Sequence, residues 1–466
     1  MTIDDDSLDR TGARMPVETL TSEQRAAGSL ATGEAVGRHQ PPNAEAPAHL
    51  TPTPPDIPDV STRYIWMQVI AQFGVFVAFI TPLGISLAIK VAQLAPGQEQ
   101  YLGYITGAGA FAVMIASPLL GQLSDRTRTR IGRRRPFMIA GMLLGMVALT
   151  VMAQSTSILI LGVGWVMTQL TWGQVLGNLQ YSQADKLPEH QRGKVAGLTG
   201  FATQVAPVLG VGVASFVSGN NLLLFLIPGF IGLLLTTLFV VFVHEEDSRG
   251  LTFDQPMTVL GTFRGMVFDP REHPDYAWAW FGRFLFYFGL TLNTTFTAFF
   301  FAQRLGVAVE DVAPTLAVLS LMGIVALSLG AIGGGFLSDR FHRRRVFVLL
   351  AGILFGAGAV TMAFAPSLPL LFAGSLVTSI GLGMFSAVDM ALALDVLPDR
   401  AQAGRYMAIM NFAAAIPQAV APLIAPSILA LGATAAVSKN YPLLYIVAAV
   451  FTVAGGAVVL RIRSVK

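Results

Sequence analysis

Two ionisable residues lie inside long apolar segments of the sequence: Arg283 in "WAWFGRFLFYFGL" and Asp389 in "GLGMFSAVDMALALDV". A charged side chain at the centre of a membrane span costs about 2.5–3.5 kcal/mol on insertion scales, so each residue is a candidate for function. We predict that the two form a salt bridge. A permanently paired Asp389 acts as a conformational lock, whereas an Asp389 that is unpaired in one state can carry a proton.

Uncharged amide and aromatic side chains also interrupt the apolar segments. Gln169 lies four residues after Trp165 and three before Trp172, so a helix places all three on one face. Amides can bind the hydroxyl groups of a sugar, and aromatic rings can cover its apolar face. Ordinary helix packing is the alternative explanation. The candidate solute-binding residues are Gln72, Trp165, Gln169, Trp172, Asn178, Tyr287 and Asn293.

The sequence lacks the side chains that most buried metal and acid–base sites use. It contains no cysteine, and its six histidines all lie outside the apolar segments. No pair of carboxylates falls within one apolar segment either. We therefore expect no enzyme activity, no metal site and no cofactor.

Membrane-spanning helices must position these residues. The chain is 53% hydrophobic and only 12% charged, whereas soluble proteins are about one quarter charged. Apolar segments of about 20 residues, the length of a span, recur through the sequence and predict an all-α polytopic membrane protein. The twelve expected spans are residues 64–89, 101–122, 137–153, 157–182, 195–217, 221–243, 277–301, 313–336, 346–365, 368–394, 404–430 and 441–461.

The spans divide into two groups of six. We predict a six-helix bundle at 63–243, a cytoplasmic loop at 244–276 and a second six-helix bundle at 277–466. Residues 1–62 are rich in proline, alanine and acidic side chains, so we expect them to be a disordered cytoplasmic tail.

Basic residues gather on alternate connections between the spans. Six arginines fall between Arg126 and Arg135, and four fall between Arg340 and Arg345. Because short basic loops stay on the cytoplasmic side, we predict that both termini are cytoplasmic. Arg130 and Arg133 to Arg135 are expected to contact lipid phosphate. Nucleic-acid binding is disfavoured because no aromatic residues interleave with the arginines.

Two loop motifs occur twice, at nearly one offset. "LSDR" begins at Leu123 and again at Leu337, 214 residues later. "DKLPEHQRGK" begins at Asp185 and "DVLPDRAQAGR" at Asp395, 210 residues later. The chain is therefore two homologous halves, and internal repeats are typical of secondary transporters.

The loop "GQLSDRTRTRIGRRRP" resembles the signature loop of the major facilitator superfamily, and the longer form "SDRTRTRIGRRRPF" is similar to that of sucrose–proton symporters and the neighbouring glycoside–pentoside–hexuronide cation symporters. The resemblance implies the major facilitator fold, with spans 1, 4, 7 and 10 around a central cavity. It also implies a cytoplasmic latch that holds the two halves together when the cavity opens outward. The residues of the predicted gate motif are Gly121, Asp125, Arg126, Gly132, Arg133, Arg134, Asp185, Arg192, Asp339, Arg340 and Asp395.

We therefore expect a secondary transporter of a small polar solute, most simply a sugar or glycoside, that works by proton symport as a monomer in the plasma or inner membrane. Sodium coupling is less supported because span 2 contains no carboxylate. Two alternatives stay open. One is an exporter of drug-like compounds, which a cavity dominated by aromatics with few amides would favour. The other is a membrane sensor that does not transport.

Overall fold

The computed structural model describes residues 58–250, 268–399, 402–432 and 439–465. Within these ranges all regular secondary structure is helical, which confirms the predicted all-α class. Residues 1–57 of the predicted tail and residues 251–267 of the predicted central loop lie outside the described residues.

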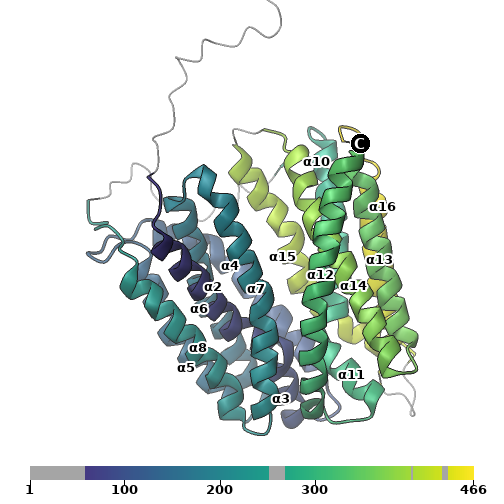
Figure 1. The fold of residues 1–466 in the computed structure, drawn as a ribbon. Helices are drawn as coiled ribbons and strands as arrows, with labels where there is room; N and C mark the ends of the chain where they lie inside the picture. Colours follow the sequence, from purple (N-terminus) through teal and green to yellow (C-terminus); the bar gives the residue numbers. More distant parts are fainter. Residues whose placement is uncertain (1–57, 251–267, 400–401, 433–438, 466) are drawn as a thin grey trace, which may run out of the picture. The chain divides into compact units, whose positions relative to one another are not determined.

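Each expected span corresponds to a helix or a pair of helices (Figure 1). The first half of the chain contains α2 (Thr62–Thr81), η3 (Pro82–Ser86), α3 (Leu87–Leu94), α4 (Gln100–Asp125), α5 (Arg135–Ala153), α6 (Ile158–Lys186), α7 (Glu189–Val217) and α8 (Asn221–Phe242). The second half contains α10 (Pro274–Thr295), α11 (Thr297–Leu305), η4 (Val309–Val312), α12 (Ala313–Phe341), α13 (Arg344–Phe364), α14 (Leu368–Asp395), α15 (Ala403–Ala430) and α16 (Tyr441–Val459). By length and apolar composition, 11 helices of the described chain can cross a membrane, or 12 when the bent pair α10 and α11 counts as one span.

The first and seventh spans are interrupted at matching positions. The first is α-helical for 20 residues and then passes through the π-helical turn η3. Pro82 begins this turn and has no N–H to donate, so the Ala78 carbonyl loses its α-helical partner. The hydroxyl of the preceding Thr81 donates to the Val77 carbonyl (2.7 Å). The seventh span is α-helical for 22 residues and then bends by 46° between α10 and α11. From the sequence, both spans are expected to be continuous helices.

The helix contacts repeat between the two halves. In the first half α2 packs against α7 and α8, α4 against α6, and α5 against α6 and α8. In the second half α10 packs against α15 and α16, α12 against α14, and α13 against α14 and α16. The halves meet through α4 with α15 and through α7 with α12, which are again equivalent pairs. Packing thus follows the repeat that the loop motifs indicate.

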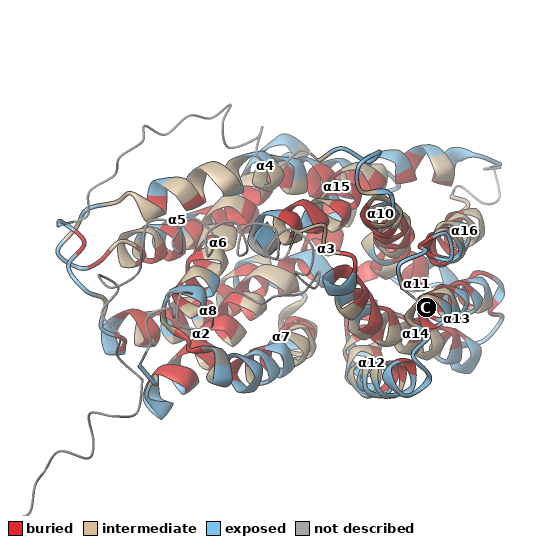
Figure 2. Cartoon of the chain, turned by 90° about the horizontal axis from the view of Figure 1, so that it is seen from above, coloured by how far each residue is buried: buried red, intermediate tan, exposed pale blue. Residues whose placement is uncertain are grey.

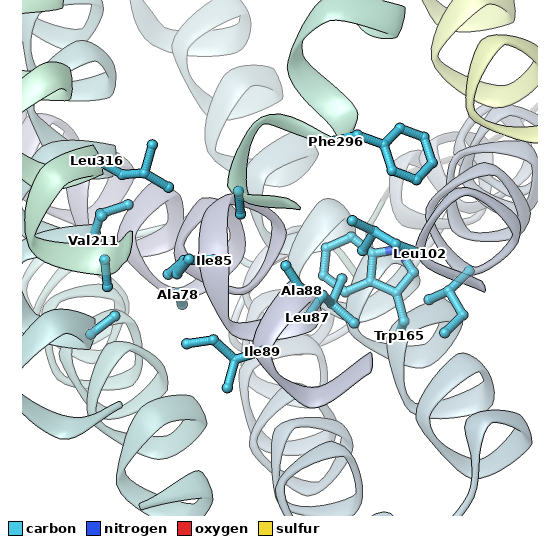
Figure 3. Packing of buried hydrophobic residues seen from close by; sticks show 14 of the residues in the cluster. Ala78, Ile85, Leu87, Ala88, Ile89, Leu102, Trp165, Val211, Phe296 and Leu316 are labelled. Atoms are coloured by element: carbon cyan, nitrogen blue, oxygen red, sulfur yellow. The ribbon is translucent and has the colours of Figure 1, made fainter. Parts of the chain in front are cut away.

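The two ends of the helical unit differ in character. We call the end that carries loops 126–134 and 342–343 the arginine end, and the end that carries α3 and α11 the distal end (upper and lower in Figure 1). Near the distal end a hydrophobic cluster takes buried side chains from both halves, including Leu102 and Trp165 from the first half and Phe296 and Leu316 from the second (Figure 3). The halves therefore share one apolar core there.

Small residues bring the halves close together. A Cβ on Gly103 would lie 2.2 Å from the Pro422 carbonyl oxygen, and one on Gly107 would lie 2.8 Å from that of Ala419. The spacing of four residues places both glycines on one face of α4, so α15 packs directly on its backbone.

Exposed residues lie on the outer sides of α7 and α12 (Figure 2). On α12 they include a stripe of large apolar side chains: Leu321, Val325, Leu329, Ile332 and Phe336. Such a stripe is typical of a helix face that contacts lipid.

Candidate functional site

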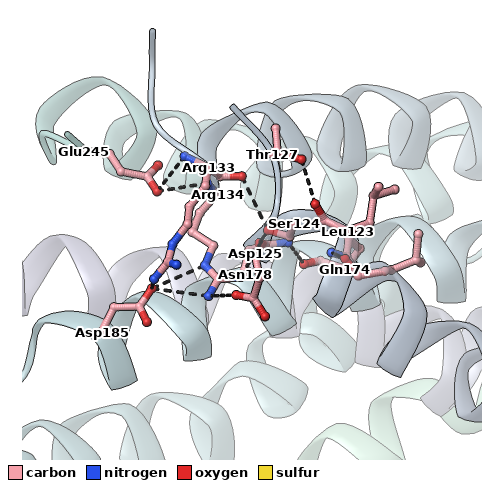
Figure 4. A network of polar contacts seen from close by, with 11 residues as sticks. Leu123, Ser124, Asp125, Thr127, Arg133, Arg134, Gln174, Asn178, Asp185 and Glu245 are labelled. Carbon is pink, nitrogen blue, oxygen red and sulfur yellow. Dashed lines mark hydrogen bonds and ion pairs between the residues drawn. The ribbon is translucent and has the colours of Figure 1, made fainter. Parts of the chain in front are cut away.

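The arginine loop of the first half forms an ion-pair cluster with the ends of α4 and α6 (Figure 4). Arg134, which is 5% exposed, pairs with Asp125 at the end of α4 and with Asp185 at the end of α6 (3.3 Å to the latter). Arg133 pairs with the same Asp185 oxygen (2.8 Å). Below them the Ser124 hydroxyl donates to Asn178 Oδ1 (2.6 Å). Four residues of the predicted gate motif are therefore brought together, all within one half.

The second half repeats this cluster with one change of partner. Arg344 pairs with Asp395 at the end of α14 and with Asp339 near the end of α12 (3.3 Å to the latter). Arg344 lies 210 residues after Arg134 and takes its place. The predicted motif did not include Arg344; its Arg340 corresponds to Arg126 in the repeated "LSDR". Arg340 is exposed, and its side chain makes no hydrogen bond or ion pair with the described residues.

Two glycines of the predicted motif have steric reasons for being glycine. A Cβ on Gly121 would lie 2.8 Å from the Tyr181 hydroxyl, so the glycine permits close packing of α4 on α6. Gly132 has a φ of +94°, a conformation that side-chain-bearing residues rarely adopt. Arg192, a motif residue in the first turn of α7, donates to the Leu187 carbonyl at the end of α6 (3.2 Å), which is a local contact.

Glu245 holds the arginine loop in place, and sequence reasoning did not find it. Its Oε1 accepts hydrogen bonds from the backbone N–H groups of Arg133 (3.1 Å) and Arg134 (2.9 Å), and its Oε2 accepts one from Arg135 (3.0 Å). These are the free N–H groups at the start of α5, and no residue of the loop itself caps them. The carboxylate follows α8, more than 100 residues away in sequence, so no local pattern indicates it.

Arg283 and Asp389 form the predicted pair. Arg283 Nη1 lies 3.1 Å from Asp389 Oδ2, and the two side chains are 7% and 9% exposed. Arg283 comes from α10 and Asp389 from α14, so both belong to the second half. The Tyr287 ring lies 5.6 Å from the guanidinium carbon, one helical turn along α10. The guanidinium is thus enclosed by a carboxylate and an aromatic face.

A cavity of about 350 Å³ lies between the two halves. It is lined by Phe79, Ile80, Leu83, Ala110, Val113, Met114, Ser117, Pro118, Gln169, Ala408, Asn411, Phe412, Ala415 and Gln418. These residues belong to the first, second, fourth and eleventh spans, whereas the resemblance implied the first, fourth, seventh and tenth. Sequence reasoning missed Asn411 and Gln418, although their spacing of seven residues puts two amides on one face of an apolar helix.

Of the seven candidate solute-binding residues, Gln169 lines this cavity. Trp165 and Trp172 are fully buried, and their indole nitrogens lie over Gly109 of α4 and Gly145 of α5 respectively. Gln72 accepts a hydrogen bond from Gln183 (3.1 Å), which joins α2 to α6. Asn178 belongs to the Ser124 contact described above. Tyr287 lies beside Arg283, and the buried Asn293 leaves its amide nitrogen without a partner among the described residues.

Polar contacts join the halves at the distal end. Tyr441 donates to Glu99 Oε2 (3.0 Å), Lys439 donates to Gln100 Oε1 (3.1 Å), and Gln93 donates to Glu310 Oε1 (3.5 Å). Burial raises the pKa of Glu99 above its usual value of about 4.5, and the Tyr441 hydroxyl and the Lys439 ammonium lower it by smaller amounts. We call these three pairs the distal contacts.

Curated proteins share short regions with the chain. Inositol transporter 4 of Arabidopsis thaliana is 34% identical over 79 residues, which cover 17% of this chain and 13% of that protein. The general alpha-glucoside permease of Schizosaccharomyces pombe is 31% identical over 114 residues, which cover 23% of this chain and 19% of that protein. The chain thus spans less than a fifth of the length of each of these relatives.

Solved structures share the fold over nearly the whole described chain. The nucleoside transporter NupG superposes with a TM-score of 0.67 at 14% identity, covering 86% of this chain and 98% of that one. The family model described as Major Facilitator Superfamily matches residues 65–334 and 324–466. The duplicated loop motifs, the repeated helix contacts and this match over both halves agree, and the chain belongs to the major facilitator superfamily.

Proposed function

We propose that this protein is a proton-coupled secondary transporter of a small uncharged polar solute, with a sugar or glycoside as the first candidate, in the plasma or inner membrane. The observation that carries the proposal is the cavity between the halves. Residues of α4 and α6 line it from one side and residues of α15 from the other, and none of its described lining residues is charged. A site shared by two bundles is one that their relative movement can open to either side of a membrane.

Two features support alternating access. The distal contacts join the halves at one end, whereas the ion-pair clusters around Arg134 and Arg344 each lie within one half at the other end. The first and seventh spans are interrupted at matching positions, and interrupted helices in equivalent places of two repeats accompany solute sites in transporters. We infer that the described state is closed at the distal end.

Uptake into proteoliposomes tests the proposal. The purified full chain is reconstituted, and uptake of radiolabelled sucrose, inositol and methyl glucoside is measured under an imposed pH gradient, an imposed sodium gradient and neither. We expect saturable uptake that the pH gradient accelerates and the sodium gradient does not. Acceleration by sodium alone would contradict proton coupling, and no uptake of any polar solute would contradict the solute class.

Export of drug-like compounds is the second candidate, because ten of the fourteen lining residues are apolar. The same proteoliposomes distinguish it when a lipophilic cation such as tetraphenylphosphonium is the labelled solute. Proton-driven movement of the cation, with no movement of sugars, would favour the exporter. A sensor that does not transport would move neither.

A further inference from the structure

The cavity between α4 and α15 has two chemically different parts. Its polar groups are three side-chain amides and one hydroxyl, from Gln169, Asn411, Gln418 and Ser117. The rest of the lining is aliphatic or aromatic, with Phe79 and Phe412 as the two rings. A solute that fills this space therefore meets amides on one part of its surface and hydrocarbon on most of the remainder.

The donor and acceptor groups of the three amides are available to a solute. Within the described part of the chain, the side chains of Gln169, Asn411 and Gln418 make no hydrogen bond to protein. Other amides of this protein hydrogen-bond to a neighbouring helix instead, as Gln183 does when it donates to Gln72. Each amide offers both a donor and an acceptor, the combination that hydroxyl groups need.

The apolar part is held rigidly on its first-half side. The Phe79 ring stacks on the fully buried Trp165, with ring centroids 6.2 Å apart and an interplanar angle of 19°. Gln169 lies one turn beyond Trp165 on the same helix, so the ring and the amide have a fixed spacing. On the second-half side, Phe412 adjoins Asn411 in the sequence of α15. Each half thus supplies a ring with an amide near it.

We propose, building on the transport function above, that this cavity selects neutral amphipathic solutes, which carry a polar hydroxyl-bearing group at one end and an apolar ring at the other. Gln169, Asn411 and Gln418 bind the polar end, and Phe79 and Phe412 cover the ring. A free hexose has hydroxyl groups on all sides and would leave several unpaired against hydrocarbon. A lipophilic cation would enter a lining without any carboxylate among the described residues.

Equilibrium binding to the full chain in lipid nanodiscs tests this selectivity without any ion gradient. The probes are phenyl β-D-glucopyranoside, glucose, sucrose and tetraphenylphosphonium. We expect the phenyl glucoside to bind at least about tenfold more tightly than glucose or sucrose. Asn411→Ala and Gln418→Ala should each weaken its binding about three- to tenfold, the range for one lost neutral hydrogen bond.

The matched control is Gln154→Ala, which removes an exposed amide at the end of α5, outside the cavity. It should leave all affinities unchanged. Phe412→Leu keeps the volume apolar but removes the ring, so it should narrow the preference for the phenyl glucoside over glucose. A thermal unfolding curve for each variant shows whether it is folded.

Two results would overturn the proposal. Glucose or sucrose binding as tightly as the phenyl glucoside would remove the amphipathic preference, and folded Asn411→Ala and Gln418→Ala with normal affinity would remove the site. Either result would leave the proposed transport of a polar solute intact when proton-driven sucrose uptake persists. Conversely, loss of proton coupling in the uptake assay would not affect a selectivity measured by binding alone.

Discussion

At the scale of single residues, the contribution of the Arg283–Asp389 pair to stability can be tested directly, because the two charges are buried and are each other's partners. Removing one partner from a buried pair costs about 3–5 kcal/mol, since the other charge stays behind uncompensated. We expect Arg283→Gln and Asp389→Asn each to lower the Tm in detergent, and the double variant to recover much of the loss. The exposed Asp311→Asn is the control. Losses that simply add would show that the two charges do not support each other.

The same pair separates a lock from a proton carrier. In the described state Asp389 is paired, which supports the lock. We expect Asp389→Asn to change the uptake rate while uptake still responds to an imposed pH gradient. Uptake that proceeds by exchange but ignores the gradient would assign proton carriage to Asp389 instead.

Glu245 provides a second residue-scale prediction. Its carboxylate caps three N–H groups at the start of α5, so Glu245→Ala should destabilise the protein by about 1–2 kcal/mol. The neighbouring Glu246→Ala is the matched control. Thermal unfolding of both variants checks the prediction, and equal Tm values would contradict the capping role.

These residues also show what the sequence can and cannot indicate. The pairing of Arg283 with Asp389 was predictable because buried charges in an apolar protein need partners. The pairing of Arg344 with Asp339 and Asp395 was not, because Arg343, Arg344 and Arg345 follow one another in the sequence and only helix geometry selects among them. The capping role of Glu245 could not be predicted, because this residue lies more than 100 residues from the helix that it caps.

At the scale of elements, the distal contacts predict that closure of the distal end depends on pH. A carboxyl group whose pKa is raised by burial binds its proton more tightly when the distal end is closed than when it is solvated. Low pH therefore favours closure, and this preference fades as the pH rises through the raised pKa of Glu99. Tyr441 and Lys439 face Glu99 from the second half. Glu99 and Glu310 both line a second cavity, of about 490 Å³, at the distal end.

Spin labels can follow this response directly, because the chain has no native cysteine. Labels at Gln98→Cys and Val307→Cys report the distal end, and labels at Arg130→Cys and Phe341→Cys report the arginine end. We expect the distance between the two distal labels to lengthen as the pH is raised from about 4.5 to about 8, and Glu99→Gln to remove most of that change. A pH response that is the same in Glu99→Gln would place its origin elsewhere.

The elements themselves were largely predictable, since length and hydropathy define a span. Their interruptions were not, although Pro82 was a visible signal inside the first span. The lining of the cavity by α15 also escaped prediction. Which helices surround a space depends on how the two halves are tilted in a given state, and no local pattern records that.

At the scale of the whole molecule, the arginine loops predict a single orientation. Both termini and both loops should face the cytoplasm, with the distal contacts outside. A membrane-impermeant maleimide applied to intact cells should label Gln98→Cys and Val307→Cys but reach Arg130→Cys only after permeabilisation. Labelling of Arg130→Cys in intact cells would reverse the orientation.

The π-helical turn η3 has a consequence for everything beyond it in the first span. A turn closed by the bond from the Leu87 N–H to the Pro82 carbonyl holds one residue more than an α-helical turn. That extra residue shifts the angular phase of α3 by about 100° relative to a straight continuation of α2. In this phase the buried Lys90 ammonium reaches the Ala153 carbonyl at the end of α5 (3.1 Å). One extra residue in a helical turn thus sets which way the last two turns of the first span face. It also allows the hydrogen bond from Lys90 that joins these turns to the third span.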